Sequence, residues 1–378
     1  MDFSLSESQK LLQSRMRNFA ATELTNADGS QPFNRESWQR CADAGIQSMP
    51  VPAPWSDSPT EDILGSVLAM EALGYGCKDN GLLFALNAHV WTVQMPLLQH
   101  GTDFQKDRYL SSLANGEWIA AQAMTEPEAG SDVFSMTTHA KRNGSNYILN
   151  GGKCYISLAP VADIFLVFAT TNPDAGRWGV SAFLVERDTP GFQVTEVTGK
   201  MGLDSVPMAS LELHDCVIPE SQRLGPESAG AGIANSALEY ERCCIMAGQV
   251  GRMQRQLEQS VDHARKRSQY GQTIGKFQSV SNRIADMKLR LETSRLLLYQ
   301  TAWMKQQGQS VAMQGAMLKL HLSEMFLDSG IDSMRIHGGS GYLTDTGVEK
   351  DVRDALGGVL YGGTSDIQRN IIAGMLGL

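Results

Sequence analysis

The stretch Ile164-Phe165-Leu166-Val167-Phe168 decides the fold class, because it places a β run in the middle of a largely helical chain. Turn residues separate it from similar runs at residues 147–149, 180–185 and 211–214. The pair Asn143-Gly144 is typical of a hairpin, and Asn150-Gly151-Gly152 is expected to form a second turn. We therefore predict a β domain over residues 119–227, in which apolar side chains follow a period of two.

Helical periodicity flanks this region on both sides. Ser6 opens an amphipathic segment, residues 63–73 predict a core helix, and prolines 50, 52, 54 and 59 interrupt regular structure between them. Further helical segments are expected at 233–263, 279–307, 312–335 and 365–375. The prediction is an α+β fold with an N-terminal helical domain (1–118), a middle β-barrel-like domain (119–227) and a C-terminal four-helix bundle (228–378).

Composition limits the possible functions. The chain has 378 residues, 42% of them hydrophobic, which is enough for two or three packed domains or layers. A net charge of −9 argues against a nucleic-acid surface. The six cysteines show neither a CxxC pair nor metal-ligand spacing, so we expect no metal and reduced thiols in a cytoplasmic protein. We also expect no membrane span, since no apolar run approaches 18 residues.

Several short motifs occur in a fixed order along the chain. They are Met1-Asp2-Phe3-Ser4-Leu5, Met124-Thr125-Glu126-Pro127 running into Ala129-Gly130-Ser131-Asp132, Arg267 four residues before Gly271, Phe277-Gln278, Ile336-His337-Gly338-Gly339 and Leu360-Tyr361-Gly362-Gly363-Thr364-Ser365-Asp366-Ile367-Gln368. A glycine-rich turn lets backbone amides approach an oxygen-rich ligand, although one such turn is a weak signal. Together these motifs resemble the acyl-CoA dehydrogenase family over nearly the whole chain. The resemblance implies that fold, bound FAD and oxidation of a thioester.

One motif departs from the family at the position that carries the chemistry. The family usually reads Tyr-Glu-Gly-Thr at Tyr361 to Thr364, and the glutamate removes the proton next to the thioester. Here that position is Gly362. Either the chain is catalytically inactive or its base lies elsewhere.

Glu241 is the candidate for a relocated base. A base for an α proton needs a carboxylate in apolar surroundings, where desolvation raises its basicity. On a helix, the neighbours three and four positions from Glu241 are Ala237, Leu238, Cys244 and Ile245, all apolar, whereas those of Glu239 are mostly polar. In isovaleryl- and long-chain-type members, and in the carrier-protein prolyl dehydrogenases, the base precedes an arginine on this helix, which matches Glu241-Arg242. The alternative is a structural carboxylate paired with that arginine.

The resemblance also implies the flavin contacts. Met124, Thr125, Gly130 and Ser131 would line the flavin, and Tyr155 and Ser157 would face its isoalloxazine ring. Arg267 resembles the arginine that reaches the FAD pyrophosphate, often that of a neighbouring subunit, and Tyr270 the aromatic beside the flavin. Gln278 resembles an adenine-side contact, Gly338 and Gly339 a tight phosphate approach next to Arg335, and Thr364 and Asp366 contacts to the adenosine diphosphate half. A cofactor shared in this way implies a homodimer or homotetramer.

Further runs, such as Pro160-Val161-Ala162-Asp163-Ile164-Phe165, resemble the dehydrogenases and oxidases of secondary metabolism. Those enzymes act on prolyl or similar groups tethered to an acyl or peptidyl carrier protein through phosphopantetheine. The expected reaction is removal of an α proton by Glu241 with hydride transfer to FAD. An electron-transfer flavoprotein or oxygen would then reoxidise the flavin. A short- or branched-chain acyl-CoA dehydrogenase and a non-catalytic flavoprotein binding module are the alternatives.

Overall fold

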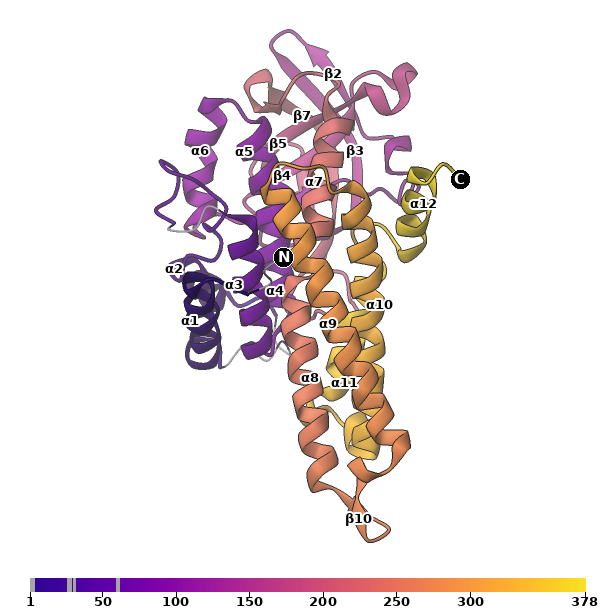
Figure 1. Ribbon diagram of the computed structural model, residues 1–378. Coiled ribbons are helices and arrows are strands. Elements are labelled where there is room, and N and C mark those ends of the chain that lie inside the picture. Colours follow the sequence, from indigo (N-terminus) through magenta and orange to yellow (C-terminus); the bar gives the residue numbers. More distant parts are fainter. Residues whose placement is uncertain (1–3, 26–28, 30–31, 59–61) are drawn as a thin grey trace.

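The computed structural model describes residues 4–25, 29, 32–58 and 62–378. Met1 to Phe3 of the N-terminal motif and Pro59 lie outside these ranges. Helices form the first part of the chain, an eight-stranded sheet the middle, and long helices the rest (Figure 1). The predicted α+β class with helical outer regions and a central β region is confirmed.

In the described part of residues 4–117, six α-helices precede the sheet. They are α1 (Glu7–Glu23), α2 (Arg35–Asp43), α3 (Ile63–Gly76), α4 (Asn80–His89), α5 (Met95–His100) and α6 (Asp103–Ala114). Ser6 caps α1: its side-chain oxygen accepts a hydrogen bond from the Gln9 backbone amide, and the side-chain oxygen of Gln9 accepts one from the Ser6 backbone amide. The predicted core helix is α3, in which every residue from Gly65 to Gly74 is buried.

A π-helical turn, Val90–Gln94, joins α4 to α5 and makes residues 80–100 one continuous helix. This helix, Asn80–His100, is long and apolar enough to cross a membrane by composition, but 83% of its apolar window is buried inside the protein. Burial in the core accounts for its apolar character. It also places Thr92, within the π-helical turn, beside the cavity described below.

The sheet has the strand order β6-β7-β3-β2-β4-β5-β8, with β1 parallel to β4. The strands are β1 (Ala120–Ala123), β2 (His139–Asn143), β3 (Asn146–Ser157), β4 (Ile164–Thr170), β5 (Val180–Glu186), β6 (Phe192–Val194), β7 (Met208–Pro219) and β8 (Arg223–Leu224). The expected hairpin joins β2 to β3, where Asn143 pairs with Asn146.

Two details of the β region differ from expectation. Asn150-Gly151-Gly152 is not a turn but an irregularity inside β3, where the register against β7 shifts between Leu149 and Gly151. Gly151 is required there, because it has a φ of +143° and a Cβ atom would lie 2.5 Å from Oγ1 of Thr138. All of β4 and nearly all of β5 are buried on both faces. Among these four strands, only β3 and β7 alternate between buried and more exposed side chains.

The C-terminal region comprises α7 (Gly230–Cys244), α8 (Ala247–Lys266), α9 (Gln278–Gln306), α10 (Ala312–His337), α11 (Val348–Gly358) and α12 (Ser365–Met375). Helices α8 to α11 form a bundle that extends away from the sheet to a small hairpin of β9 (Ser268–Gln269) and β10 (Gln272–Thr273) (Figure 1). We call this end the bundle tip; it comprises residues 263–278 and 335–342.

One helix prediction in this region was wrong, and one helix was not predicted. The single helix expected over residues 233–263 is broken at Ile245 and Met246, because α7 packs against β5 and the cavity while α8 packs against α3. Helix α11 was missed because its sequence is rich in charge. Its Lys350, Asp351 and Asp354 are buried and paired inside the protein, notably Asp351 with Arg252 at 2.7 Å.

The close approach of α3 and α8 depends on glycine. A Cβ atom at Gly74 would lie 1.8 Å from the carbonyl oxygen of Gly248, so the two backbones are in contact. We predict that Gly74→Ala lowers the free energy of unfolding by about 1–3 kcal/mol through overpacking, measured by denaturant titration. Gly374→Ala on α12, where a Cβ atom meets nothing within 4 Å, is the control and should not destabilise. Equal stability of the two variants would contradict this packing.

Candidate active site

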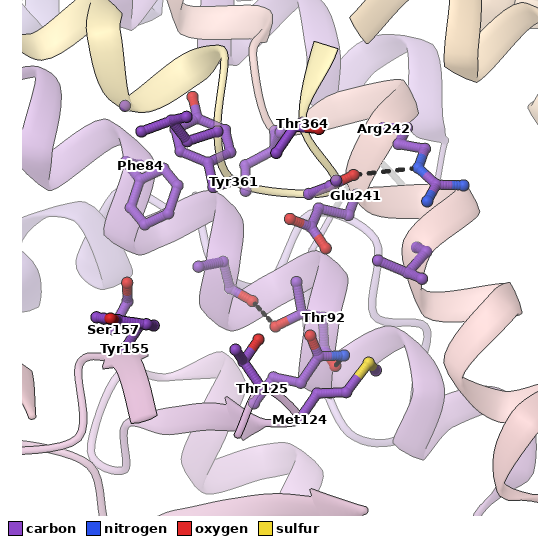
Figure 2. A pocket seen from close by; sticks show the side chains of 18 of the residues that line it. Phe84, Thr92, Met124, Thr125, Tyr155, Ser157, Glu241, Arg242, Tyr361 and Thr364 are labelled. Atoms are coloured by element: carbon purple, nitrogen blue, oxygen red, sulfur yellow. Dashed lines mark hydrogen bonds between the residues drawn. The ribbon is translucent and has the colours of Figure 1, made fainter. Parts of the chain in front are cut away.

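A cavity of about 1280 Å³ lies where the N-terminal helices, the sheet and the C-terminal helices meet. Its walls come from α4 and the following π-helical turn, the ends of β1 and β3, the loop before β7, and α7, α11 and the turn that leads into α12. Segments far apart in sequence therefore share one chamber (Figure 2). It is large enough for a cofactor together with a small substrate.

Glu241 points into this cavity from α7 (Figure 2). Its side chain is only 7% exposed, as the apolar helix face predicted. Burial raises the pKa of its carboxyl above the ordinary value, while the cations Arg242 and Lys319 act in the opposite direction. A carboxylate in such surroundings is suited to accept a proton near neutral pH.

Gly362 leaves the space that the Glu241 carboxylate occupies. A Cβ atom at Gly362 would lie 2.9 Å from Oε1 of Glu241, closer than a side chain and a carboxylate can normally coexist. Gly362 and Gly363 have φ values of +64° and +87°, which glycine adopts without strain. Position 362, which lacks the family's glutamate, and Glu241, the candidate replacement for that glutamate, are therefore in contact.

Hydrogen bonds fix this turn. Nε of Arg242 donates to the carbonyl oxygen of Gly362 at 3.2 Å. Nε2 of the fully buried Gln368 donates to the carbonyls of Gly362 and Gly363 at 3.0 and 2.9 Å. Arg242 is thus bonded to the turn, and no ion pair to Glu241 is found among the residues that the structure describes.

Glu239 has a different environment on the same helix. Its side chain is 19% exposed and forms an ion pair with Lys305 at 3.3 Å. It also accepts a hydrogen bond from the backbone amide of Val311, at the start of α10. These contacts give Glu239 a structural role, although it borders the same cavity.

The predicted flavin residues separate into two groups. Eight of the predicted site residues line the cavity: Glu241, Met124, Thr125, Gly130, Ser131, Tyr155, Ser157 and Thr364. Six others lie at the bundle tip: Arg267, Tyr270, Gln278, Arg335, Gly338 and Gly339. Asp366 belongs to neither group, since its exposed carboxylate on α12 pairs with Arg369 at 2.9 Å.

The two groups are far apart within one chain. Helix α10 begins beside the cavity at Ala312 and ends next to Gly338 after 26 residues, which corresponds to about 39 Å. One bound dinucleotide cannot contact both groups of the same chain at that separation.

Each group presents an aromatic ring on strained backbone. Tyr155 has a φ of +59° and is 67% exposed at the cavity wall; Tyr270 has a φ of +50° and is 95% exposed at the bundle tip. A bulky residue at positive φ is uncommon and is often found at ligand sites. Both rings offer a flat apolar surface that a planar ligand could cover.

A buried ion pair supports the cavity wall near Met124 and Thr125. Nζ of Lys153 lies 2.8 Å from Oε1 of Glu126 and donates to the carbonyl of Met124 at 3.0 Å. Burial alone would raise the pKa of Glu126, but Lys153 and hydrogen bonds from the Thr137–Thr138 segment lower it to about 2. This pair holds in place the strand end whose residues face the cavity.

Sequence reasoning missed one aromatic contact in the cavity wall and one buried cation near it. Phe84 on α4 and Tyr361 pack with ring centroids 4.7 Å apart and close the space beside Glu241 (Figure 2). Lys319 on α10 is 1% exposed and lies among small or apolar neighbours. The helical-face test that selected Glu241 would have selected Lys319, whereas nothing local in the sequence brings Phe84 to Tyr361.

Comparisons with known proteins define the class. Sequence models of the N-terminal, middle and C-terminal domains of acyl-CoA dehydrogenase match residues 6–117, 121–216 and 228–377. The chain belongs to the acyl-CoA dehydrogenase family.

Individual relatives match along their full length. The chain is 42% identical to the L-prolyl-[peptidyl-carrier protein] dehydrogenase of Serratia sp., over all of this chain and 99% of that protein. It is 41% identical to the enzyme of the same name from Pseudomonas fluorescens, over 99% of each. Among solved structures, the prolyl acyl carrier protein oxidase AnaB is 43% identical, with a TM-score of 0.97 over 99% of this chain and all of that one. PigA with FAD and proline is 41% identical, with a TM-score of 0.97 over the whole of both chains.

The contact between Glu241 and position 362 gives a testable result. Gly362→Ala should shift the Glu241 carboxylate and lower the rate of flavin reduction at least tenfold, in addition to a backbone cost of about 1–3 kcal/mol. Gly347→Ala is the matched control, because Gly347 has a similar φ of +66° but open space at its Cβ position. Stopped-flow flavin bleaching and thermal unfolding measure the two effects. If both variants reduce flavin equally fast, the contact does not govern the chemistry.

Proposed function

We propose that this protein is an FAD-dependent dehydrogenase or oxidase of a small acyl thioester, with a prolyl group on a peptidyl carrier protein as the substrate. The observation that carries the proposal is the Glu241 carboxylate, which fills the space next to Gly362 in the cavity. A family member that had only lost its base would have no reason to place a buried carboxylate there. The two prolyl carrier-protein dehydrogenases at 41–42% identity support the choice of substrate.

In this mechanism Glu241 removes the α proton of the acyl group. The carbonyl oxygen of Gly362 accepts hydrogen bonds from Arg242 and Gln368, which hold the turn in place. Within residues 62–378 no group accepts a hydrogen bond from that N–H, so it can donate to the thioester oxygen. Such a bond stabilises negative charge on that oxygen as the proton leaves. When bound, FAD supplies the hydride acceptor for the β position.

The residues present fit FAD. Gly130 has open space above it, where a side chain would otherwise stand, and the exposed ring of Tyr155 forms the wall nearby. The cavity group would bind the flavin half through Met124, Thr125 and Ser157. At the bundle tip Arg267 is exposed, and no ion pair involves it in the described part of the chain, so it can bind a phosphate.

The separation of the two groups supports a shared cofactor site. Each FAD would lie in the cavity of one chain and contact Arg267, Tyr270 and Gln278 from the bundle tip of a second chain. This arrangement requires a homodimer or a homotetramer. It also explains why the bundle tip carries exposed glycines and an exposed aromatic ring so far from the cavity.

The cavity favours a small acyl group. Phe84 and Tyr361 form an aromatic wall beside Glu241, and the Tyr361 hydroxyl is held by Nε2 of Gln249 at 2.9 Å. A pyrrolidine ring can pack against such a wall, and its protonated nitrogen would be attracted to the ring faces. The electron acceptor, oxygen or an electron-transfer flavoprotein, is to be identified by assaying both. The six cysteines are buried thiols, which suits the reducing cytoplasm.

Substrate bleaching tests the proposal. Purified holoenzyme is mixed anaerobically with prolyl-loaded carrier protein and, separately, with short- and branched-chain acyl-CoA esters. Flavin bleaching by the prolyl carrier protein is expected. Bleaching by acyl-CoA alone would show an ordinary acyl-CoA dehydrogenase, and no bleaching would show a binding module.

The base assignment predicts unequal effects at two glutamates of one helix. Glu241→Gln should lower the rate of flavin reduction by about 10²- to 10⁴-fold while FAD stays bound. Glu239→Gln should cost far less, because Glu239 is already paired with Lys305. Single-turnover flavin reduction measures both. Retained turnover in Glu241→Gln, or equal loss in both variants, would show that the base is misassigned.

The shared site predicts complementation between defective chains. Arg267→Ala should weaken FAD binding, and Glu241→Gln should block proton removal, so each variant alone is inactive. Co-expressed with distinct tags and purified through both, they should regain part of the wild-type activity, since some sites then combine an intact cavity with an intact bundle tip. Hybrids without regained activity would place both residues in the site of one chain.

A further inference from the structure

Lys319 is a buried cation that the proposed mechanism leaves unused. Its side chain on α10 is 1% exposed, and within residues 62–378 no hydrogen-bond partner of its Nζ atom is found. The residues three and four positions away along the helix are Gly315, Ala316, Leu322 and Ser323, all buried. An ammonium group in such a place is costly unless an opposite charge lies nearby. The identity of that charge indicates its role.

Lys319 lies beside the turn that contacts Glu241. Its Nζ atom is 6.0 Å from the ring centroid of Tyr361, which directly precedes Gly362. A Cβ atom at Gly362 would in turn be 2.9 Å from the Glu241 carboxylate. Lys319 therefore lies close to Tyr361, in the turn whose Gly362 contacts the proposed base.

The charged groups around Lys319 single out Glu241 as its counter-charge. They are Glu241 and Arg242 on α7 and Glu324 on α10 itself, and the uncharged ring of Tyr361, on the turn after α11, also faces Lys319. Glu324 is partly exposed and lies 3.8 Å from Arg369, so another cation already faces it. Arg242 donates its Nε hydrogen to the Gly362 carbonyl. Glu241 is the remaining buried carboxylate among these groups, and it interacts electrostatically with Lys319, which makes it the candidate counter-charge.

We infer that Lys319 is a positioning residue that keeps the Glu241 carboxylate ionised and ready to accept the α proton of the substrate. The inference rests on the proposed role of Glu241 as the base. Burial alone favours the protonated acid, which could not act as a base, and an opposite charge nearby restores the ionised form. Arg242 contributes to this balance but is also needed to hold the turn, whereas Lys319 has no other partner in the described residues.

The same cation affects the end of the reaction. Once Glu241 has taken up the proton, Lys319 is left as a buried charge without a counter-charge. That state is unfavourable, so Glu241 is driven to release the proton before the next turnover. Lys319 thus limits how far burial can raise the basicity of Glu241, without touching the substrate.

The test measures the protonation of Glu241 directly in the holoenzyme. The infrared carbonyl band of its protonated carboxyl, assigned by its loss in Glu241→Gln, is followed against pH in the wild type and in Lys319→Met. The midpoint should rise by about one pH unit or more in Lys319→Met. The acidic limb of the pH profile of flavin reduction should shift by the same amount. At a pH below both midpoints, Lys319→Met should therefore reduce flavin about tenfold more slowly than the wild type.

Two matched variants separate charge from packing. Lys319→Arg keeps a cation and should keep the midpoint near the wild-type value. Lys305→Met removes the cation that pairs with Glu239 and should leave the Glu241 midpoint unchanged. An unchanged or lowered midpoint in Lys319→Met overturns the inference.

Flavin content and thermal unfolding establish that each variant is folded. If Lys319→Met is not, the neutral Lys319→Gln variant is titrated in its place with the same expectations. The infrared titration needs no turnover, so it tests the effect of Lys319 on Glu241 by itself. The flavin-reduction rate of Glu241→Gln tests the base assignment separately, so the two failures are distinguishable.

Discussion

The site depends on one steric exchange, in which the Glu241 carboxylate occupies space that a side chain at position 362 would otherwise fill. At the distance of 2.9 Å between that carboxylate and a Cβ atom at Gly362, a side chain at this position would force the carboxylate to shift. Positive φ angles at Gly362 and Gly363 strengthen the constraint, because they allow the tight turn that brings its backbone to α7. Helix α7, the turn and α12 must therefore be considered together.

The compensation of buried charges is the second physical constraint on the site. The cavity region contains Glu241 with Lys319, Glu126 with Lys153, and the α11 network that includes Asp351 with Arg252. Burying a charge is unfavourable unless an opposite charge or hydrogen bonds compensate for it. In the last two pairs the partners are in direct contact. Around Glu241 no direct partner is found in the described residues, which leaves its carboxylate open to the cavity.

The sequence was sufficient for the parts of the fold that obey local rules. Ser6 with Gln9 marks the start of α1, Asn143-Gly144 marks the β2–β3 hairpin, and the apolar face around Glu241 predicts its burial. Sequence reasoning failed where tertiary contacts determine where a helix breaks or whether a charged side chain is buried. The break at Ile245 and the burial of Asp351 in α11, where it pairs with Arg252, reflect packing partners that are distant in sequence.

The candidate site shows the same division. Family resemblance named residues at both ends of the molecule, but only the structure shows that they form two groups at opposite ends of α10. The aromatic wall of Phe84 and Tyr361 joins residues 277 positions apart, and no local pattern predicts such a contact. Lys319, by contrast, follows the helical-face rule that found Glu241. Its small and apolar neighbours along the helix are visible in the sequence, so the same rule predicts its burial.

The most direct test of the relocated base is a crystal structure of the FAD complex with a non-oxidisable prolyl thioester analogue. The quantity to measure is the distance between the Glu241 carboxylate and the α carbon of the bound acyl group. We expect about 3–3.5 Å, with the carboxylate and the flavin on opposite faces of the acyl group. A carboxylate turned away from the α carbon, or a different side chain in contact with it, would contradict the account.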